Sequence, residues 1–428
     1  MKKITWLSYF FFASLLAAGT YPDVGYEPPA SWTDPKFVLS QDYPQALPPD
    51  ENYPWTAIDF KQHPQDYLKA VIKYCYEGNL EAEFVPQKNT KRHWYHAPWL
   101  HYGPNQREFV HGLTGERNSR PFELAATQSD RYRNVAVGFY NDKGGYALGK
   151  FWHDPAAPNI KGVSFPEGTV TFKLLFTTAL PAKVPYLVNS PEWVADLDHS
   201  QNVATIKDTK VRLLQIDIAV KDARSSCGGW IFGTFHYDNA TAGKTPWEKL
   251  RPLTLLWGDD PTLTQAMANG GTKPKESWVN SASPIVKYRK NATASGAPKV
   301  LGWAGRGNGP VDNPISSCLS CHSTAQSPVK TPILPSGSDT DKLRWFRNLA
   351  PNEAFDAGGD SFDFSQQLSA GLQNFKAFNK VASTSGGISN EGPAPVPPAM
   401  QPLTTPATAA TPAATPEKEF KVSRDPEG

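Results

Sequence analysis

The chain has almost no net charge and, beyond its first residues, no long apolar run. Its 428 residues include 43 Lys and Arg against 41 Asp and Glu, a formal charge of +2. Lys2 and Lys3 lie at the extreme N-terminus, and without them the chain carries 41 residues of each sign. Such a balance argues against electrostatic binding to nucleic acid or to an anionic membrane. A multispan membrane protein is excluded too, because each spanning helix needs about 20 consecutive apolar residues.

The N-terminus has the pattern of a secretory signal peptide. A Met-Lys-Lys start is followed by an apolar run over residues 4–18 and by small residues that end at Gly19. This order predicts that residues 1–20 are removed on export. A retained N-terminal anchor is the alternative, and the absence of a cysteine at the cleavage zone argues against a lipoprotein. We expect a periplasmic or secreted protein with no integral membrane span in the mature chain.

Composition and periodicity divide the remaining chain into four parts. Residues 21–129 are expected to form an arm that wraps the core, with a helix from Pro64 to Glu77 where apolar residues recur at helical spacing. A β-rich core is expected over residues 130–328 and a helical segment over residues 329–390. Residues 391–428 are dominated by Pro, Ala and Thr, a composition typical of a disordered or semi-rigid spacer.

Alternating apolar residues predict the strands of the core. Residues 135–140 and 146–152 flank an Asn-Asp-Lys-Gly-Gly segment and are expected to form a hairpin. Further strands are expected over residues 169–178, 211–220, 230–237 and 253–257. No helical pattern separates these strands, so we expect a mainly β (α+β) fold: an antiparallel sheet or sandwich with a few peripheral helices. In the later helical segment, Asp363 and Gln366 have the spacing of a capping box.

The most informative stretch is Cys318-Leu319-Ser320-Cys321-His322. Cys-x-x-Cys-His is the attachment signature of c-type haem, because two thiols three positions apart can add to the two vinyl groups while the histidine reaches the iron. We therefore predict one covalent haem c, attached through Cys318 and Cys321, with His322 as the proximal iron ligand.

The four cysteines of the chain leave other arrangements open. A structural zinc site would want a second close ligand pair, and a thioredoxin-like redox pair would want a strand–helix setting. A disulfide between Cys318 and Cys321 would close a strained small ring. The remaining Cys75 and Cys227 are expected to pair in an oxidising compartment, with two free buried thiols as the alternative.

Other residues of the iron site are predicted from scarcer signals. No Met occurs between His322 and Met400, so we expect a distal position that is open or filled by histidine. Four of the nine histidines lie in one Trp- and Tyr-rich stretch: His93, His96, His101 and His111. His96 and His101 are the distal candidates, and ordinary hydrogen-bonding histidines are the alternative. Arg306, in a glycine-rich loop before the motif, is a candidate partner for a haem propionate, unless that loop is simply flexible.

Three pieces of sequence follow one another along the core. Residues 165–170 read Phe-Pro-Glu-Gly-Thr-Val, residues 228–233 read Gly-Gly-Trp-Ile-Phe-Gly, and the haem motif follows the sheet. This order resembles the cytochrome P-460 and cytochrome c′-beta family over about residues 130–325. The resemblance implies an antiparallel β fold, a five-coordinate haem on His322, and chemistry on hydroxylamine, nitric oxide or a similar ligand. Hydroxylamine-oxidising members also bond a lysine to the haem; no motif identifies it here, and Lys173 is merely nearby in sequence.

The sequence thus predicts a secreted mono-haem c-type cytochrome that transfers electrons to a redox partner protein. One alternative is a cytochrome P-460-like oxidoreductase or a haem protein that binds a small molecule such as hydroxylamine or nitric oxide. Another is an envelope interaction module with an accessory haem. A carrier predicts a sixth protein ligand and an exposed haem edge, whereas an enzyme predicts an open distal site with an acid, base or histidine nearby.

Overall fold

The computed structural model describes residues 27–100 and 107–384. The expected signal peptide, the Pro/Ala/Thr-rich tail with Met400, and the distal candidate His101 therefore lie outside the described residues. Within the two described ranges, no helix is both long and apolar enough to cross a membrane.

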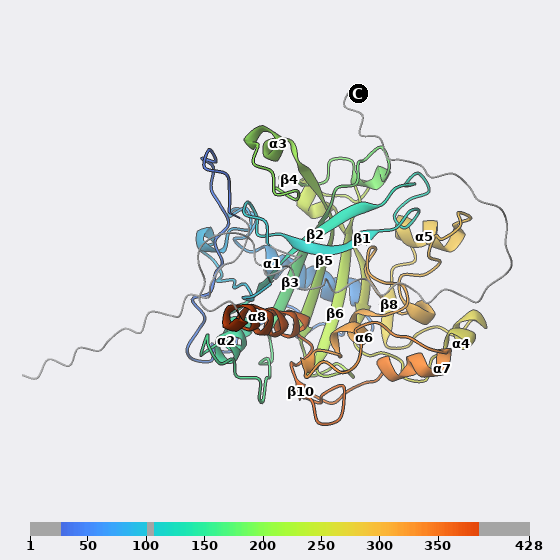
Figure 1. The fold of residues 1–428 in the computed structure, drawn as a ribbon. Coiled ribbons are helices and arrows are strands. Elements are labelled where there is room, and N and C mark those ends of the chain that lie inside the picture. The colour runs from blue at the N-terminus through green and yellow to red at the C-terminus, as the bar shows by residue number, and fades with distance from the viewer. Residues whose placement is uncertain (1–26, 101–106, 385–428) are drawn as a thin grey trace, which may run out of the picture. The chain divides into compact units, whose positions relative to one another are not determined.

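An eight-stranded antiparallel sheet forms the centre of the fold (Figure 1) and confirms the expected mainly β, α+β class. The strand order is β1-β2-β3-β5-β6-β7-β8, and β4 pairs with β5. The strands are β1 Thr114–Ser119, β2 Tyr132–Tyr140, β3 Val170–Thr177, β4 Glu192–Val194, β5 Lys210–Lys221, β6 Trp230–Tyr237, β7 Leu250–Leu256 and β8 Ser277–Val279. The strands expected between residues 169 and 257 are confirmed as β3, β5, β6 and β7, and the sheet starts before residue 130, with β1.

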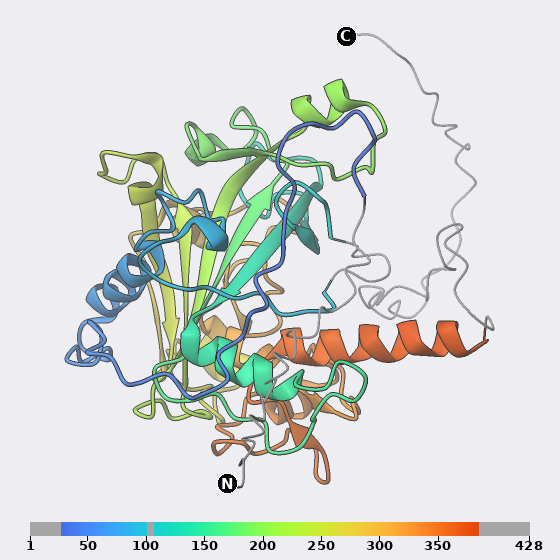
Figure 2. The same cartoon turned by 90° about the vertical axis from the view of Figure 1, so that its left-hand side faces the viewer.

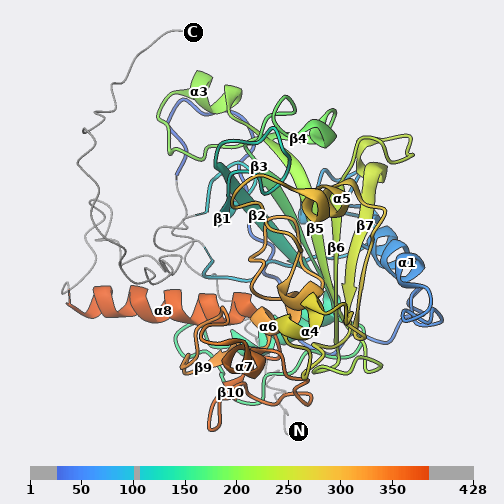
Figure 3. The ribbon, with the colours of Figure 1, turned by 90° about the vertical axis from the view of Figure 1, so that its right-hand side faces the viewer.

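Helices lie on both faces of the sheet (Figures 2 and 3). On one face is α1 (Pro64–Tyr76), and on the other are α6 (Cys318–His322), α7 (Asp339–Lys342) and α8 (Gln366–Thr384). The other α-helices are α2 Asp142–Phe151, α3 Val203–Asp208, α4 Gln265–Asn269 and α5 Pro284–Asn291. Short 3₁₀ turns span Pro86–Lys88, Pro185–Leu187, Pro246–Lys249, Trp303–Gly305 and Leu343–Trp345, and a separate two-stranded sheet pairs β9 (Gln326–Ser327) with β10 (Asp360–Ser361).

Two hydrophobic clusters bury the two faces of the sheet. Successive residues of a strand point to opposite faces, so Phe139 packs in the cluster with α1 while its neighbour Tyr140 packs in the cluster with α6 and α8. Cys75 belongs to the first cluster and Cys227 to the second. Both are free thiols, so the disulfide expected between them is wrong.

The second half of the expected hairpin is a helix. Asn141 caps α2, because its side-chain oxygen accepts a hydrogen bond from the Gly144 N–H. Buried Asn141 makes three further hydrogen bonds, to the Val170 N–H, the Gly168 carbonyl and the Tyr74 hydroxyl. An Asn-Asp segment with glycines suits both a hairpin turn and a helix N-terminus, and these long-range partners select the helix.

Asn141→Ala is expected to lower the free energy of unfolding by about 2–4 kcal/mol, since it removes a cap and leaves buried partners unbonded. Asn202→Ala is a matched control: Asn202 caps α3 through the Ala204 N–H but is exposed, and its loss should cost about 1 kcal/mol or less. Urea denaturation of both variants measures the difference. Equal losses would show that the buried partners of Asn141 contribute nothing.

Candidate functional site

The Cys-x-x-Cys-His motif forms the short helix α6. Ser317 and Ser320 close a capping box at its start: the Ser317 hydroxyl accepts from the Ser320 N–H at 2.9 Å, and the Ser320 hydroxyl accepts from the Ser317 N–H at 2.8 Å. Residues three apart in a helix are neighbours on its surface, so the side chains of Cys318 and Cys321 lie on one side of α6. The capped helix therefore presents both thiols together.

Both thiols of the motif are free and partly exposed. Cys318 and Cys321 are free, so the disulfide alternative between them is wrong. Burial raises the pKa of Cys321 to about 12 and raises that of Cys318 well above its usual range. A redox-active pair needs a lowered thiol pKa, so this setting does not suit a thioredoxin-like role. Among the described residues, no group of three or more His, Cys, Asp and Glu side chains could hold a metal ion.

The His322 imidazole is fixed by a residue far along the chain. Its Nδ1 lies 2.9 Å from the carbonyl oxygen of Phe364. A carbonyl only accepts, so Nδ1 carries the proton and Nε2 keeps its lone pair. Burial lowers the pKa of His322 to about 4, which keeps the ring neutral at pH 7. A neutral imidazole that donates Nδ1–H to a backbone carbonyl is the form in which histidine binds a metal.

The chain's own residues fit a covalently attached haem at α6. Cys318 and Cys321 would supply the thioether sulfurs, and Nε2 of His322 would supply the iron ligand. The His322 ring also packs against Phe232 of β6, with ring centroids 4.5 Å apart, so the ligand nitrogen has one preferred direction. Haem would bring an iron centre able to change oxidation state by one electron.

The predicted capping box of Asp363 and Gln366 is wrong, because both side chains have distant partners. The Gln366 amide donates to the Cys321 carbonyl at 2.6 Å and to the Thr324 hydroxyl at 2.9 Å. Asp363 instead accepts hydrogen bonds from the sheet, among them one from Lys221. The start of α8 is thereby attached to the motif helix.

A polar row of the sheet lies on the same face as the motif. Cross-strand pairing aligns Gly138, Lys173, Asp217, Thr234 and Thr254 across five strands. Thr234 is two residues from Phe232, which contacts His322, so the row shares the face of α6. Lys173 and Asp217 interrupt the apolar runs Phe-Lys-Leu and Ile-Asp-Ile. These two charged residues within apolar runs are the sequence signal from which the row could have been predicted.

Lys173 is the cation of this row. Its ammonium lies 3.3 Å from the Asp217 carboxylate and 3.4 Å from the Glu116 carboxylate. Burial dominates the pKa shifts of the motif residues, but the Lys173 charge also acts to lower the pKa of all three: Cys318, Cys321 and His322. No motif in the sequence identified Lys173, and strand pairing brings it within electrostatic reach of α6.

Arg306 holds the loop before the motif together. The buried guanidinium donates to four backbone carbonyls, those of Asp259, Asp260, Leu263 and Trp303. It also stacks on Phe346, with 4.3 Å to the ring centroid. These contacts account for Arg306 as a structural residue, and its contact with a haem propionate stays a prediction.

The structure does not bring His96 to the motif. Its Nδ1 accepts from the Ser40 N–H at 3.0 Å, and its ring packs against Phe37 and Phe139 at centroid distances of 5.0 and 5.1 Å. Phe139 points to the α1 face of the sheet, whereas His322 lies on the other face. The distal role predicted for His96 is therefore corrected to a packing role. Two other histidines of the cluster also lie elsewhere: His93 is exposed beside Asp142, and His111 stacks on Trp193.

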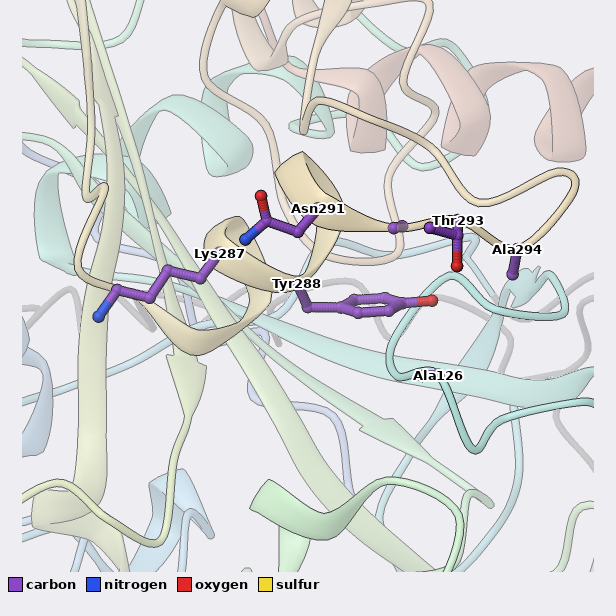
Figure 4. Close-up of a pocket in the computed structure, with 7 residues that line it drawn as sticks. Ala126, Lys287, Tyr288, Asn291, Thr293 and Ala294 are labelled. Carbon is purple, nitrogen blue, oxygen red and sulfur yellow. The ribbon is translucent and has the colours of Figure 1, made fainter.

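A surface pocket of about 330 Å³ lies beside α5 and shares no residue with the motif (Figure 4). Its lining consists of Ala126, Lys287, Tyr288, Asn291, Ala292, Thr293 and Ala294. Figure 4 shows the Lys287 ammonium pointing away from the Tyr288 ring. No acid, histidine or cysteine lines this pocket, so it lacks the side chains that commonly bind metals, and α6 remains the candidate site.

A buried carboxylate supports the start of α6 and predicts a pH effect. Asp259 accepts from the Ser317 hydroxyl at 2.5 Å, and burial raises its pKa to about 7 from 3.8. From about pH 4 to about pH 7 the folded protein holds a proton that the unfolded chain has lost, so the free energy of unfolding falls as pH rises. Asp259→Asn keeps an oxygen acceptor but has no carboxyl group to titrate. The variant should therefore lack the decrease in the free energy of unfolding, on the order of 4 kcal/mol, that wild type shows over this pH range.

Urea denaturation of the wild-type chain and Asp259→Asn across this pH range measures the effect. We expect the variant to gain stability relative to wild type as pH rises. A difference between the two proteins that stays constant with pH would show that Asp259 does not titrate in this range.

Comparison with known proteins identifies no relative: no protein-family model, no curated protein and no solved structure matches the chain.

Proposed function

We propose that the chain is a mono-haem c-type cytochrome that works in redox chemistry, with Cys318 and Cys321 as attachment points and His322 as the proximal ligand. One observation carries this proposal: the Phe364 carbonyl accepts a hydrogen bond from Nδ1–H of His322, so Nε2 keeps its lone pair, next to two free thiols. The proposal needs no rearrangement of α6, because the capping box and the Gln366 contact already fix the helix.

Electron transfer to a redox partner protein is the general use of such a site. An electron carrier needs its cofactor near the surface so that a partner can approach it. Cys318, Cys321 and His322 all keep partial solvent exposure, although α6 packs through the fully buried Leu319. This placement supports an accessible edge of the site.

Chemistry on a small ligand is a second candidate, and the polar row supports it. Lys173 and Asp217 provide a cation and a carboxylate near the motif, and burial raises the pKa of Asp217 above its usual range. Groups with shifted pKa values near a reactive centre are suited to proton transfer. The resemblance to the cytochrome P-460 and cytochrome c′-beta family points the same way, with hydroxylamine or nitric oxide as the implied ligand class.

Replacing Cys318 and Cys321 together by Ala is expected to abolish covalent haem. The full chain would be coexpressed with haem-maturation machinery and stained for haem after denaturing electrophoresis. Cys75→Ala is the matched control, because Cys75 is free and buried in the hydrophobic cluster on the α1 face, and its loss should leave the stain unchanged. Haem that survives denaturation in the double variant would refute the attachment site.

Carbon monoxide tests the distal side of the iron. His96, one of the two distal candidates, lies on the other face of the sheet. Small-ligand chemistry predicts that the Soret band of the reduced protein shifts when the gas is added, whereas an electron carrier predicts an unchanged band. The reduced optical spectrum with and without carbon monoxide measures this. An unchanged band would reveal a sixth protein ligand. It would then rule out small-ligand chemistry and support electron transfer.

A further inference from the structure

The carbonyl that holds His322 belongs to an unfavourable backbone turn. Asp363 and Phe364 have φ values of 45° and 67°, in the left-handed region. Non-glycine residues avoid this region, and a bulky aromatic residue there is an outlier. Such a conformation persists only where the surrounding structure enforces it, and outliers of this kind gather at functional sites. Hydrogen bonds to the Asp363 side chain hold this turn.

The Asp363 carboxylate is fully buried and has three donors. The Lys221 ammonium lies 2.6 Å from Oδ1 and 2.8 Å from Oδ2, the Trp230 indole N–H donates at 2.9 Å, and the Phe165 N–H donates at 2.7 Å. Lys221 also donates to the Gly228 carbonyl at 2.9 Å. A buried charge pair is tolerated when further hydrogen bonds satisfy both ions, and this pair meets that condition.

The donors come from one end of the sheet. Lys221 at the end of β5 is the cross-strand partner of Trp230 at the start of β6. Between them, Gly228 has a φ of +60°, and a Cβ on it would lie 2.2 Å from the Phe364 ring. The Phe364 ring therefore sits directly on the glycine backbone. Both residues of the strained turn are thus fixed to the β5–β6 connection.

We propose that Lys221 and Asp363 are positioning residues for the proximal histidine. Their ion pair locks the left-handed turn, and the turn aims the Phe364 carbonyl at Nδ1 of His322. None of the hydrogen bonds of the pair goes to His322 or to the thiols, so the pair acts through the backbone of Phe364. This inference rests on the proposed haem function for its consequence at the iron, but the effect on the tautomer of His322 belongs to the protein alone.

Loss of the pair has a defined direction at the iron. A carbonyl that accepts a hydrogen bond from Nδ1–H makes the imidazole a more basic ligand. The axial ligand and its hydrogen bonds tune the reduction potential of the iron. A more basic ligand favours the oxidised iron. Weakening the Phe364 contact should therefore shift the potential to more positive values.

Asp363→Asn is the primary test. In the haem-free full chain with ¹⁵N-labelled histidine, NMR reports the tautomer of His322, assigned by the loss of its signals in His322→Gln. We expect wild type to hold the proton on Nδ1, and Asp363→Asn to populate both tautomers. In the haem-loaded protein the same variant should show a more positive reduction potential.

Asp238→Asn is the matched control. Asp238 is also a buried carboxylate, paired with Arg251 at 2.8 Å, but it lies at the other end of β6 and does not contact the turn. It should keep the wild-type tautomer and potential. A general loss of stability would affect both variants alike, whereas a positioning role affects only Asp363→Asn.

Trp230→Phe keeps the ion pair and removes one hydrogen-bond donor to Asp363. It tests the positioning role if Asp363→Asn does not fold. It should change the tautomer and the potential in the same direction by a smaller amount. A folded Asp363→Asn, or failing that Trp230→Phe, with the wild-type tautomer and potential would overturn the positioning role. If wild type takes up no haem, the proposed function fails, and the tautomer measurement alone still decides the role of the pair.

Discussion

The hydrogen bond from His322 Nδ1 to the Phe364 carbonyl joins the motif helix to the rest of the protein. It fixes the tautomer of the imidazole, and it brings together α6 and the residues that precede α8. The same junction is reinforced by the Gln366 amide on the Cys321 carbonyl and by Asp363, which reaches down to the sheet. Because Asp363, Phe364 and Gln366 lie within four consecutive residues, one short segment ties α6 to the sheet and to α8.

Hydrophobic clusters pack on both faces of the sheet, and the face of α6 also carries charged residues. The α1 face is filled by an aromatic and aliphatic cluster that includes Phe139 and Phe172, stacked at a centroid distance of 4.6 Å. The α6 face instead carries buried or half-buried charges, among them Lys173, Asp217 and Asp259. Burying charge costs free energy unless it is paired or hydrogen-bonded, and Lys173, Asp217 and Asp259 each have such a partner. The α6 face therefore combines a hydrophobic cluster with paired charges.

Local patterns in the sequence predicted much of the fold but little of the site's surroundings. Period-two alternation identified β3, β5, β6 and β7, and helical spacing identified α1, because burial on one side repeats along each element. The sequence could not distinguish a hairpin from a helix after Asn141. The partners that select the helix are Val170, at the start of β3, and Gly168, two residues before it, and both are distant in sequence. The helix cap predicted for Asp363 is wrong for the same reason, because its partners Lys221 and Trp230 are distant in sequence.

The residues around the motif show the same limit. Cys318, Cys321 and His322 carry a signature that needs no structural context. His96 was a candidate because histidines cluster near it in the sequence, yet strand alternation at Phe139 takes it to the other face. Lys173 lies about 150 residues before His322 in the chain and reaches α6 only through the pairing of the strands. Proximity of this kind is a property of topology.

The most direct test of this account is the intact mass of the full chain after coexpression with haem-maturation machinery, followed by peptide mapping. The account predicts a mass increase equal to one haem, carried by the peptide that contains Cys318, Cys321 and His322. An unmodified chain, or haem on a peptide with Cys75 or Cys227, would contradict it.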